Sequence, residues 1–206
     1  MEVSFLGQGL ENTELATGNV LIESLSDRDF NEFSCLVAFV SSAGIKGLSE
    51  HIEEAKDHIE DFNIIVGIDH EGTSREALET LLKLDVDAKV FHTTSKLTFH
   101  PKVYLFEGAE KAKIIIGSSN ITTQGLFQNF ESSILIEYSK PEEEGELIMA
   151  EIREYFESLF NSTHGNLQPL SEGYIQELVE DGVIPEDSRE IDSSSEYREG
   201  TGGGIS

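Results

Sequence analysis

The sequence predicts an α/β fold, in which helices flank a mixed β-sheet. Short, nearly continuous apolar runs alternate with segments of helical periodicity between residues 33 and 138, which is typical of a sheet that is covered on both faces. The 206 residues are 38% hydrophobic and 26% charged, the composition of a globular domain with a sizeable core. No repeat with a regular period is visible, so a solenoid or a propeller is not expected.

The first half of this region predicts three strands that alternate with two helices. Residues 33–41, 62–68 and 88–93 are short apolar runs typical of buried strands. After the first run, apolar residues recur at spacings of three and four on one face of a helix, namely Ile45, Leu48, Ile52, Ala55 and Ile59. Thr73 or Ser74 is expected to cap the second helix.

The second half predicts three more strands and a long helix. Residues 102–106 and 111–117 are separated by a short turn, which indicates a hairpin, and residues 132–138 form a further strand. Pro141 and the three glutamates after it open the helix. Its apolar side is expected to consist of Leu147, Ile148, Ile152, Tyr155, Phe156 and Leu159.

We divide the chain into three parts. Residues 1–165 form the α/β domain, with an edge strand at residues 3–6 and a second, unassigned piece at residues 19–25. Residues 166–185 form a short helical extension whose amphipathic segment docks on the domain. Residues 186–206 are mostly Glu, Asp, Ser and Gly, which predicts a disordered acidic tail or linker.

The charge balance argues against a broad surface for nucleic acid or anionic lipid. The 14 Lys and Arg against 40 Asp and Glu give 14 − 40 = −26. Cys35 is the only cysteine, so neither an internal disulfide nor a cysteine zinc cluster is possible. The first residues lack the pattern of a secretory signal, and no apolar stretch approaches the roughly 20 residues that span a bilayer. These features predict a cytoplasmic protein that does not insert into membranes.

Residues 99–138 carry the chemistry. Strand side chains alternate, so His100 and Lys102 project to the same face of their strand. The next apolar strand ends at the turn GSSN, residues 117–120, whose glycine lets backbone approach a ligand closely. A nucleophilic nitrogen, a fixed cation and a small polar turn therefore meet at one edge of the sheet. This combination suits an anionic phosphodiester.

On these residues the chain resembles the phospholipase D superfamily, whose signature is H-x-K-x4-D followed by G-S-x-N. The residues that match as they stand are His100, Lys102, Gly117, Ser118 and Asn120. Glu131 heads the next strand, where nucleases of the superfamily carry a histidine-orienting glutamate. The signature occurs once, which resembles the single-motif nuclease branch that includes metal-independent restriction endonucleases. The resemblance implies a phospholipase D-like mixed β-sheet flanked by helices, with one HKD motif per chain.

The resemblance also implies covalent phosphoryl transfer that needs no metal and no cofactor. His100 attacks phosphorus to form a phosphohistidine, and the partner subunit's His100 protonates the leaving oxygen. Lys102 and Asn120 of both subunits hold the non-bridging oxygens, and Ser118 supports the phosphate pocket. Glu131 fixes the tautomer of His100, and water then releases the histidine.

Two departures from the signature stand out. Glu107 occupies the Asp position, and the gap between Lys102 and Gly117 is three residues longer than usual. The longer gap falls in the hairpin turn, where insertions are tolerated.

The remaining polar candidates are weaker. His51 and His58 are expected to be surface histidines, and residues 69–71 (DHE) form either a polar loop or a metal site. His92 is a candidate for lining the cleft, and residues 95–96 for contacting the substrate backbone.

The leading interpretation is a metal-independent endonuclease that cleaves DNA, or RNA, as part of a restriction or defence system. A homodimer builds the site, and a separate DNA-recognition or helicase subunit or domain is a further partner. The alternatives are a phospholipid-hydrolysing enzyme, which the lack of an obvious amphipathic membrane-binding segment disfavours, and a non-catalytic dimerising nucleic-acid-binding module beside a helicase.

The acidity leaves two explanations open. It reflects a salt-loving source, or it keeps a nuclease off non-cognate DNA until a basic partner delivers it. Lys96, Lys102, Lys111 and Lys113 are close to the motif in sequence and predict a positive field inside the acidic shell. Binding of nucleic acid by this chain alone is expected to be weak and salt-sensitive.

Overall fold

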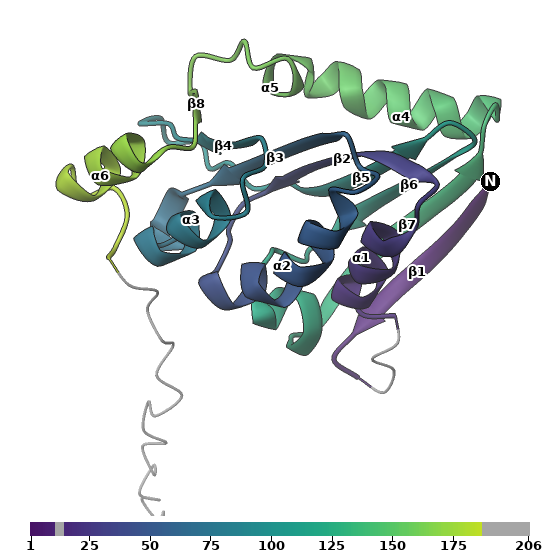
Figure 1. Ribbon diagram of the computed structural model, residues 1–206, viewed down its shortest axis with the longest axis horizontal. Helices are drawn as coiled ribbons and strands as arrows, with labels where there is room; N and C mark the ends of the chain where they lie inside the picture. The colour runs from purple at the N-terminus through teal and green to yellow at the C-terminus, as the bar shows by residue number, and fades with distance from the viewer. Residues whose placement is uncertain (11–14, 187–206) are drawn as a thin grey trace, which may run out of the picture.

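The computed structural model describes residues 1–10 and 15–186, which are built around one eight-stranded sheet (Figure 1). The strands are β1 (Glu2–Gln8), β2 (Phe30–Val37), β3 (Asp61–Gly67), β4 (Ala88–Phe91), β5 (Lys102–Gly108), β6 (Lys111–Gly117), β7 (Glu131–Ser139) and β8 (Leu167–Pro169). They lie in the order β1-β7-β6-β5-β2-β3-β4-β8. β3 runs parallel to both β2 and β4, and the other neighbouring pairs are antiparallel. The predicted mixed sheet is confirmed.

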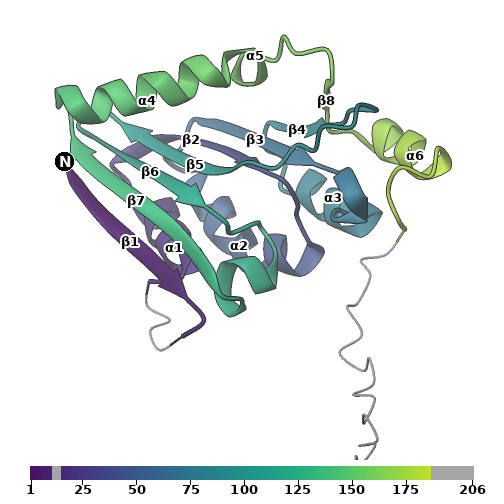
Figure 2. The ribbon, with the colours of Figure 1, turned by 180° about the vertical axis from the view of Figure 1, so that it is seen from behind.

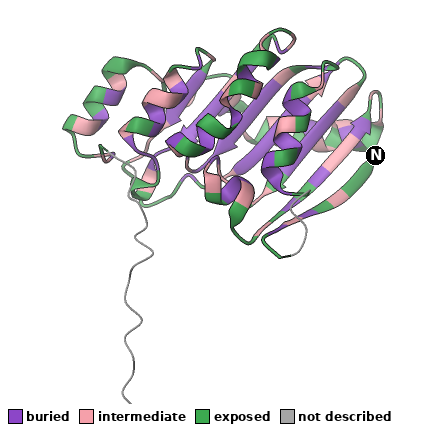
Figure 3. Cartoon of the chain, turned by 60° about the horizontal axis from the view of Figure 1, so that its bottom comes forward, coloured by how far each residue is buried: buried purple, intermediate pink, exposed green. Residues whose placement is uncertain are grey.

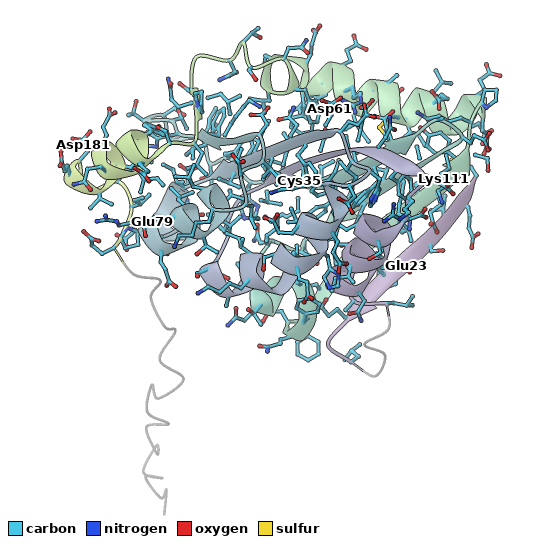
Figure 4. All side chains as sticks on the ribbon, in the orientation of Figure 1. Glu23, Cys35, Asp61, Glu79, Lys111 and Asp181 are labelled. Carbon is cyan, nitrogen blue, oxygen red and sulfur yellow. The ribbon has the colours of Figure 1, made fainter. Side chains whose placement is uncertain are left out.

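Helices cover both faces of the sheet, so the fold has three layers (Figures 1 and 2). One face carries α1 (Thr17–Ser26), α2 (Ser42–Ala55), α3 (Arg75–Leu82) and α6 (Glu172–Glu180), and the other carries α4 (Glu143–Tyr155) and α5 (Glu157–Phe160). A hydrophobic cluster fills the space on each side. Two-sided cover explains why β2 and β3 are nearly continuous apolar runs. Cys35 lies in the middle of β2 and is fully buried (Figure 4).

Serine caps fix where α2 and α3 begin. Ser41 accepts a hydrogen bond from the N–H three residues on at 3.0 Å, and Ser74 does the same at 3.3 Å. The helix cap is therefore Ser74 and not Thr73. The buried Thr73 hydroxyl instead bonds backbone groups at the end of β3 and after β2, which ties the two parallel strands together at this edge.

The helix that follows Pro141 differs from the prediction at two of the six residues that were assigned to its apolar side. It breaks into α4 and α5, and Leu147 and Tyr155 are 57% and 83% exposed. Met149 is buried instead. The stripe that faces the sheet runs through residues 145, 149, 152 and 156, at spacings of four and three, and residue 147 lies off this stripe.

The ends of the chain complete the sheet. β1 confirms the edge strand predicted at residues 3–6, and residues 19–25 lie within α1. β8 was not predicted, because three residues show no periodicity, and it pairs with β4. α6 buries Ile175 and Leu178 as an amphipathic helix that packs near α3.

The tail predicted to be disordered lies, from residue 187 onward, outside the described residues. None of the helices in the described ranges is long and apolar enough to cross a membrane.

Candidate active site

The residues of the predicted site gather at one edge of the sheet. β2, β3 and β6 end at this edge, and β5 and β7 begin there, because both run antiparallel to their neighbours. His100 and Lys102 stand at the start of β5, Ser118 and Asn120 follow β6, and Glu131 opens β7. In Figure 2 it is the edge at which β1 ends, away from the labelled N-terminus.

The exposed His100 ring rests against the buried Lys102. Lys102 Nζ lies 2.7 Å from Nδ1 and 2.9 Å from Nε2 of His100, and it donates to the His100 carbonyl oxygen at 3.2 Å. Lys102 is only 5% exposed. An ammonium group this close to both ring nitrogens repels a second positive charge, so it favours the neutral imidazole. The ring of Phe39 meets the imidazole edge to face, with centroids 5.8 Å apart.

The pKa values of His100 and Lys102 are both lowered, which favours the neutral form of each group. Partial burial, and then the positive charges of Lys102 and His70, lower the pKa of His100 from its ordinary 6.5. Burial also lowers the pKa of Lys102, and the negative charge of Glu131 opposes that shift. His100 is therefore neutral at neutral pH, and one ring nitrogen carries a lone pair.

Asn120 is held by its amide oxygen. Oδ1 accepts a hydrogen bond from the Phe39 backbone N at 3.1 Å, which ties the turn after β6 to the segment after β2. A backbone bond from Ser41 N to Ile121 O, at 2.9 Å, supports the same connection. The amide nitrogen of Asn120, with its two N–H groups, is left as the end of the side chain that can bind an anion.

Glu131 hydrogen-bonds Ser118. Ser118 Oγ donates to Glu131 Oε2 and accepts from Ser132 N at 3.1 Å. The described part of the chain has no hydrogen bond between Glu131 and His100, which is the contact that a tautomer-fixing role needs. In this geometry Glu131 instead orients the Ser118 hydroxyl and, through its charge, stabilises protonated Lys102.

Buried groups beneath the site hold the turn at residues 117–120. These groups were not identified from the sequence. Tyr104 Oη donates to Ser119 O at 2.7 Å, and the hydroxyls of Thr17 and Ser119 lie 3.0 Å apart. Tyr104 projects to the same face of β5 as the lysine of the site, so strand alternation could have identified it. Gly117 is required by packing, because an added Cβ would lie 2.1 Å from Ser133 Oγ on β7.

Glu107, at the acidic position of the motif, lies away from the site. It stands near the far end of β5 and accepts hydrogen bonds from Arg153 Nε at 2.7 Å and from Lys140 Nζ at 3.2 Å. Glu107 therefore connects the sheet to α4 and to the segment that precedes it.

Lys111 and Lys113 do not contribute to a positive field at the site, and that expectation was wrong. Both lie at the start of β6, where Lys111 pairs with Asp27 at 2.6 Å and Lys113 with Glu137 at 3.0 Å. In Figure 4 Lys111 lies close to α1, at the end of the sheet where the chain begins. β6 advances about 3.3 Å per residue, so it carries these lysines away from the residues that follow it.

The other candidates surround the edge. Ser95 and Lys96 are exposed in the loop between β4 and β5 that leads to His100. His92 extends the pairing of β4 with β8 through its backbone N–H. Within residues 1–10 and 15–186, no group of three or more His, Cys, Asp or Glu side chains is arranged to hold a metal ion.

Comparison with known protein sequences gives one family. Residues 9–177 match the family described as "NgoFVII restriction endonuclease N-terminal PLD domain", where PLD stands for phospholipase D. No curated protein sequence matches the chain significantly.

Solved structures share the fold. Nuc, a phospholipase D family member from Salmonella typhimurium, has a TM-score of 0.54 and 16% identity, over 82% of this chain and 98% of its own. NucT from Helicobacter pylori gives 0.55 and 16%, over 78% and 96%. Phosphatidylserine synthase from Haemophilus influenzae gives 0.55 and 13%, over 87% and 44%. Identities this low show the fold alone, which is the phospholipase D-like α/β fold.

Proposed function

Because this chain belongs to the family of the NgoFVII restriction endonuclease N-terminal phospholipase D domain, and is on that ground a phospholipase D-like nuclease, we propose that it cleaves DNA through a covalent intermediate on His100. The observation that carries the proposal is the exposed His100 imidazole, whose lowered pKa keeps it neutral beside the buried Lys102. A neutral imidazole next to a cation combines the nucleophile with the charge that a phosphodiester needs.

The first step makes and breaks one bond to phosphorus. A ring nitrogen of His100 attacks, the phosphorus–nitrogen bond forms, and the bond to the leaving oxygen of the DNA breaks. The leaving oxygen takes a proton from the partner subunit's His100, which must therefore be protonated while the attacking histidine is neutral.

The second step restores the enzyme. The partner subunit's His100, now neutral, takes a proton from water, whose oxygen attacks phosphorus as the phosphorus–nitrogen bond breaks. The products are a free imidazole and a DNA end that carries the phosphate.

Fixed donors supply the charge stabilisation in this proposal. Lys102 lies against the nucleophile, and the amide nitrogen of Asn120 is the free end of a side chain anchored at Phe39. Ser118, oriented by Glu131, supports the phosphate pocket. Two copies of this set, one from each subunit, are proposed to neutralise the phosphate without a metal ion.

An exposed apolar stripe supports the homodimer. Val3, Phe5, Ile134 and Ile116 lie on β1, β7 and β6, and each is at least 40% exposed. Phe5 stands opposite Ile134, and Ile134 stands opposite Ile116, so their side chains adjoin on one face. Figure 3 shows exposed, intermediate and buried residues along β1 at the sheet margin, near the labelled N-terminus. Contiguous apolar surface of this kind marks interaction sites, and this one includes Ile134 of β7, the strand that Glu131 opens.

The setting we propose is a cytoplasmic restriction or defence system in which a DNA-recognition or helicase subunit or domain delivers the substrate. With a net charge of −26, and with Lys111 and Lys113 paired to carboxylates far from the site, this chain has little positive surface for DNA. A basic partner would supply the affinity that the acidic chain lacks.

Cleavage of plasmid DNA in excess EDTA tests the proposal. We expect the wild-type protein to nick or linearise the plasmid and His100→Ala to lose at least a thousandfold in rate, since the nucleophile is gone. His51→Ala, which removes a histidine of α2 remote from the site, is the matched control and should cleave normally. A wild-type protein that leaves DNA and RNA intact but hydrolyses phosphatidylcholine would replace the nuclease proposal with the phospholipid-hydrolysing alternative.

A further inference from the structure

His70 occupies an unfavourable backbone conformation at the same edge of the sheet as His100. It lies in the 3₁₀ turn Asp69–Glu71 that directly follows β3. His70 and Glu71 have φ values of 55° and 57°, in the left-handed region that disfavours residues with a Cβ. Two consecutive residues of this kind are maintained only where the surrounding structure holds them, and such positions cluster at functional sites.

Two hydrogen bonds hold this turn to the segment that leads into β5. His70 Nε2 lies 3.1 Å from Thr98 Oγ1, two residues before His100. Asp69 Oδ2 accepts from Phe99 N at 2.8 Å. The first bond orients the imidazole of His70. The second occupies the Asp69 carboxylate with a backbone N–H.

A packing contact connects the turn to the His100 ring as well. Gly72 lies so close to Phe39 that an added Cβ would be 2.3 Å from its Cδ1. The Phe39 ring in turn meets the His100 ring edge to face, with centroids 5.8 Å apart. The turn, Phe39 and His100 therefore form one continuous surface, on which the His70 side chain is exposed.

His70 and His100 are close enough to interact electrostatically. A positive charge on His70 is among the causes that lower the pKa of His100. The Thr98 hydroxyl can donate to Nε2 of His70, and in that tautomer Nδ1–H is the ring donor that remains for a ligand.

We propose that His70 is a further substrate-binding residue, which donates a hydrogen bond to a phosphate oxygen of the DNA backbone next to the phosphate that His100 attacks. The inference rests on the proposed function and adds a contact outside the HKD signature. It explains why an imidazole is kept in a conformation that glycine or asparagine would adopt more easily. Phosphate contacts of this kind fix the register of a nucleic acid without reading its sequence.

Substitutions at His70 can separate binding from folding. His70→Gly removes the donor and relieves the backbone strain, so we expect an unchanged or higher Tm together with a loss of about tenfold or more in kcat/KM, mainly through KM. His70→Asn tolerates the same conformation and keeps an N–H donor, so its loss should be smaller. Asp85→Gly is the matched control, since Asp85 has a φ of 50° at the opposite edge of the sheet, before β4. It should also have an unchanged or higher Tm, and it should leave cleavage unchanged.

Binding without turnover separates this inference from the proposed function. In a His100→Ala background, adding His70→Gly should weaken binding of a fluorescein-labelled DNA duplex by about tenfold at low salt, as expected for one charge-assisted contact. A stable His70→Gly variant that binds and cleaves DNA like the wild type would overturn the inference while leaving the nuclease intact. Wild-type protein that binds DNA in a His70-dependent way without cleaving it would overturn the nuclease and keep the inference.

Discussion

Glu107→Gln is expected to destabilise the fold and to leave the cleavage rate of the folded protein unchanged. Glu107 stands at the acidic position of the motif, five residues after Lys102. A strand advances about 3.3 Å per residue, so the two lie about 17 Å apart along β5. The Glu107 carboxylate is bonded by Arg153 and Lys140, outside the site.

The expected loss of stability depends on how deeply the ion pairs of Glu107 with Arg153 and Lys140 are buried. The Glu107 side chain is 16% exposed. Breaking a buried ion pair costs about 3–5 kcal/mol, whereas an exposed pair contributes under about 1 kcal/mol. Glutamine retains one acceptor oxygen, so we expect a loss of about 1–2 kcal/mol in the free energy of unfolding. In a domain of this size, that corresponds to a fall of about 2–8 °C in Tm.

Thermal melting followed by circular dichroism measures the first effect, and cleavage rates well below the transition measure the second. Glu131→Gln is the paired comparison and should show the opposite pattern, because Glu131 bonds Ser118 at the site. A tenfold loss of cleavage in folded Glu107→Gln, with Tm unchanged, would refute the structural role of Glu107.

Three further predictions follow from the same geometry. Phe5→Glu puts a charge on the apolar stripe, so sedimentation should show a monomer with little activity; an active monomer would rule out a site shared between subunits. Tyr104→Phe leaves the Ser119 carbonyl without its donor, so unfolding should cost about 1–2 kcal/mol less and cleavage should slow; a Tm equal to wild type would contradict this. Because burial, Lys102 and His70 lower the pKa of His100, its neutral form persists below pH 6.5. The acid limb of kcat/KM should have its midpoint below 6.5, and a midpoint above it would contradict this reading of the site.

Strand alternation and the motif were sufficient to predict that His100, Lys102 and the turn at residues 117–120 lie at one edge of the sheet. His100, Lys102 and the turn at residues 117–120 depend on one hairpin, whose two strands have clear apolar runs and a short connection. Local sequence determines such a hairpin, so its ends could be assigned before the structure was known. The positions of β1 beside β7 and of β8 beside β4 depend on long-range pairing, which no local pattern encodes.

Each difference from the sequence-based prediction has its own physical cause. Lys111 and Lys113 are near the motif in sequence, but an extended strand separates near neighbours faster than a helix or a turn does. The partner of Glu131 could not be predicted, because register between β6 and β7 decides whether its carboxylate reaches Ser118. Leu147 and Tyr155 were wrongly assigned to the buried side of α4, because apolar residues occur around much of that helix.

The positions of the lysines show how little positive charge lies near the site of this acidic chain. Lysines that sequence proximity had assigned to the site are neutralised at the far edge. Lys102 supplies positive charge directly beside His100. The proposed function therefore depends on the pairing of subunits, which would double this charge, and on a basic partner that would deliver the DNA.

Trapping the covalent intermediate tests the central proposal most directly. The protein is mixed with DNA in EDTA, quenched in alkali during turnover, digested and mapped by mass spectrometry, because phosphohistidine is stable to base. We expect a nucleotide phosphate on His100 in the wild type and none on His100→Ala. Cleavage that proceeds with no adduct on His100, under conditions where a synthetic phosphohistidine peptide survives the same work-up, would contradict the mechanism.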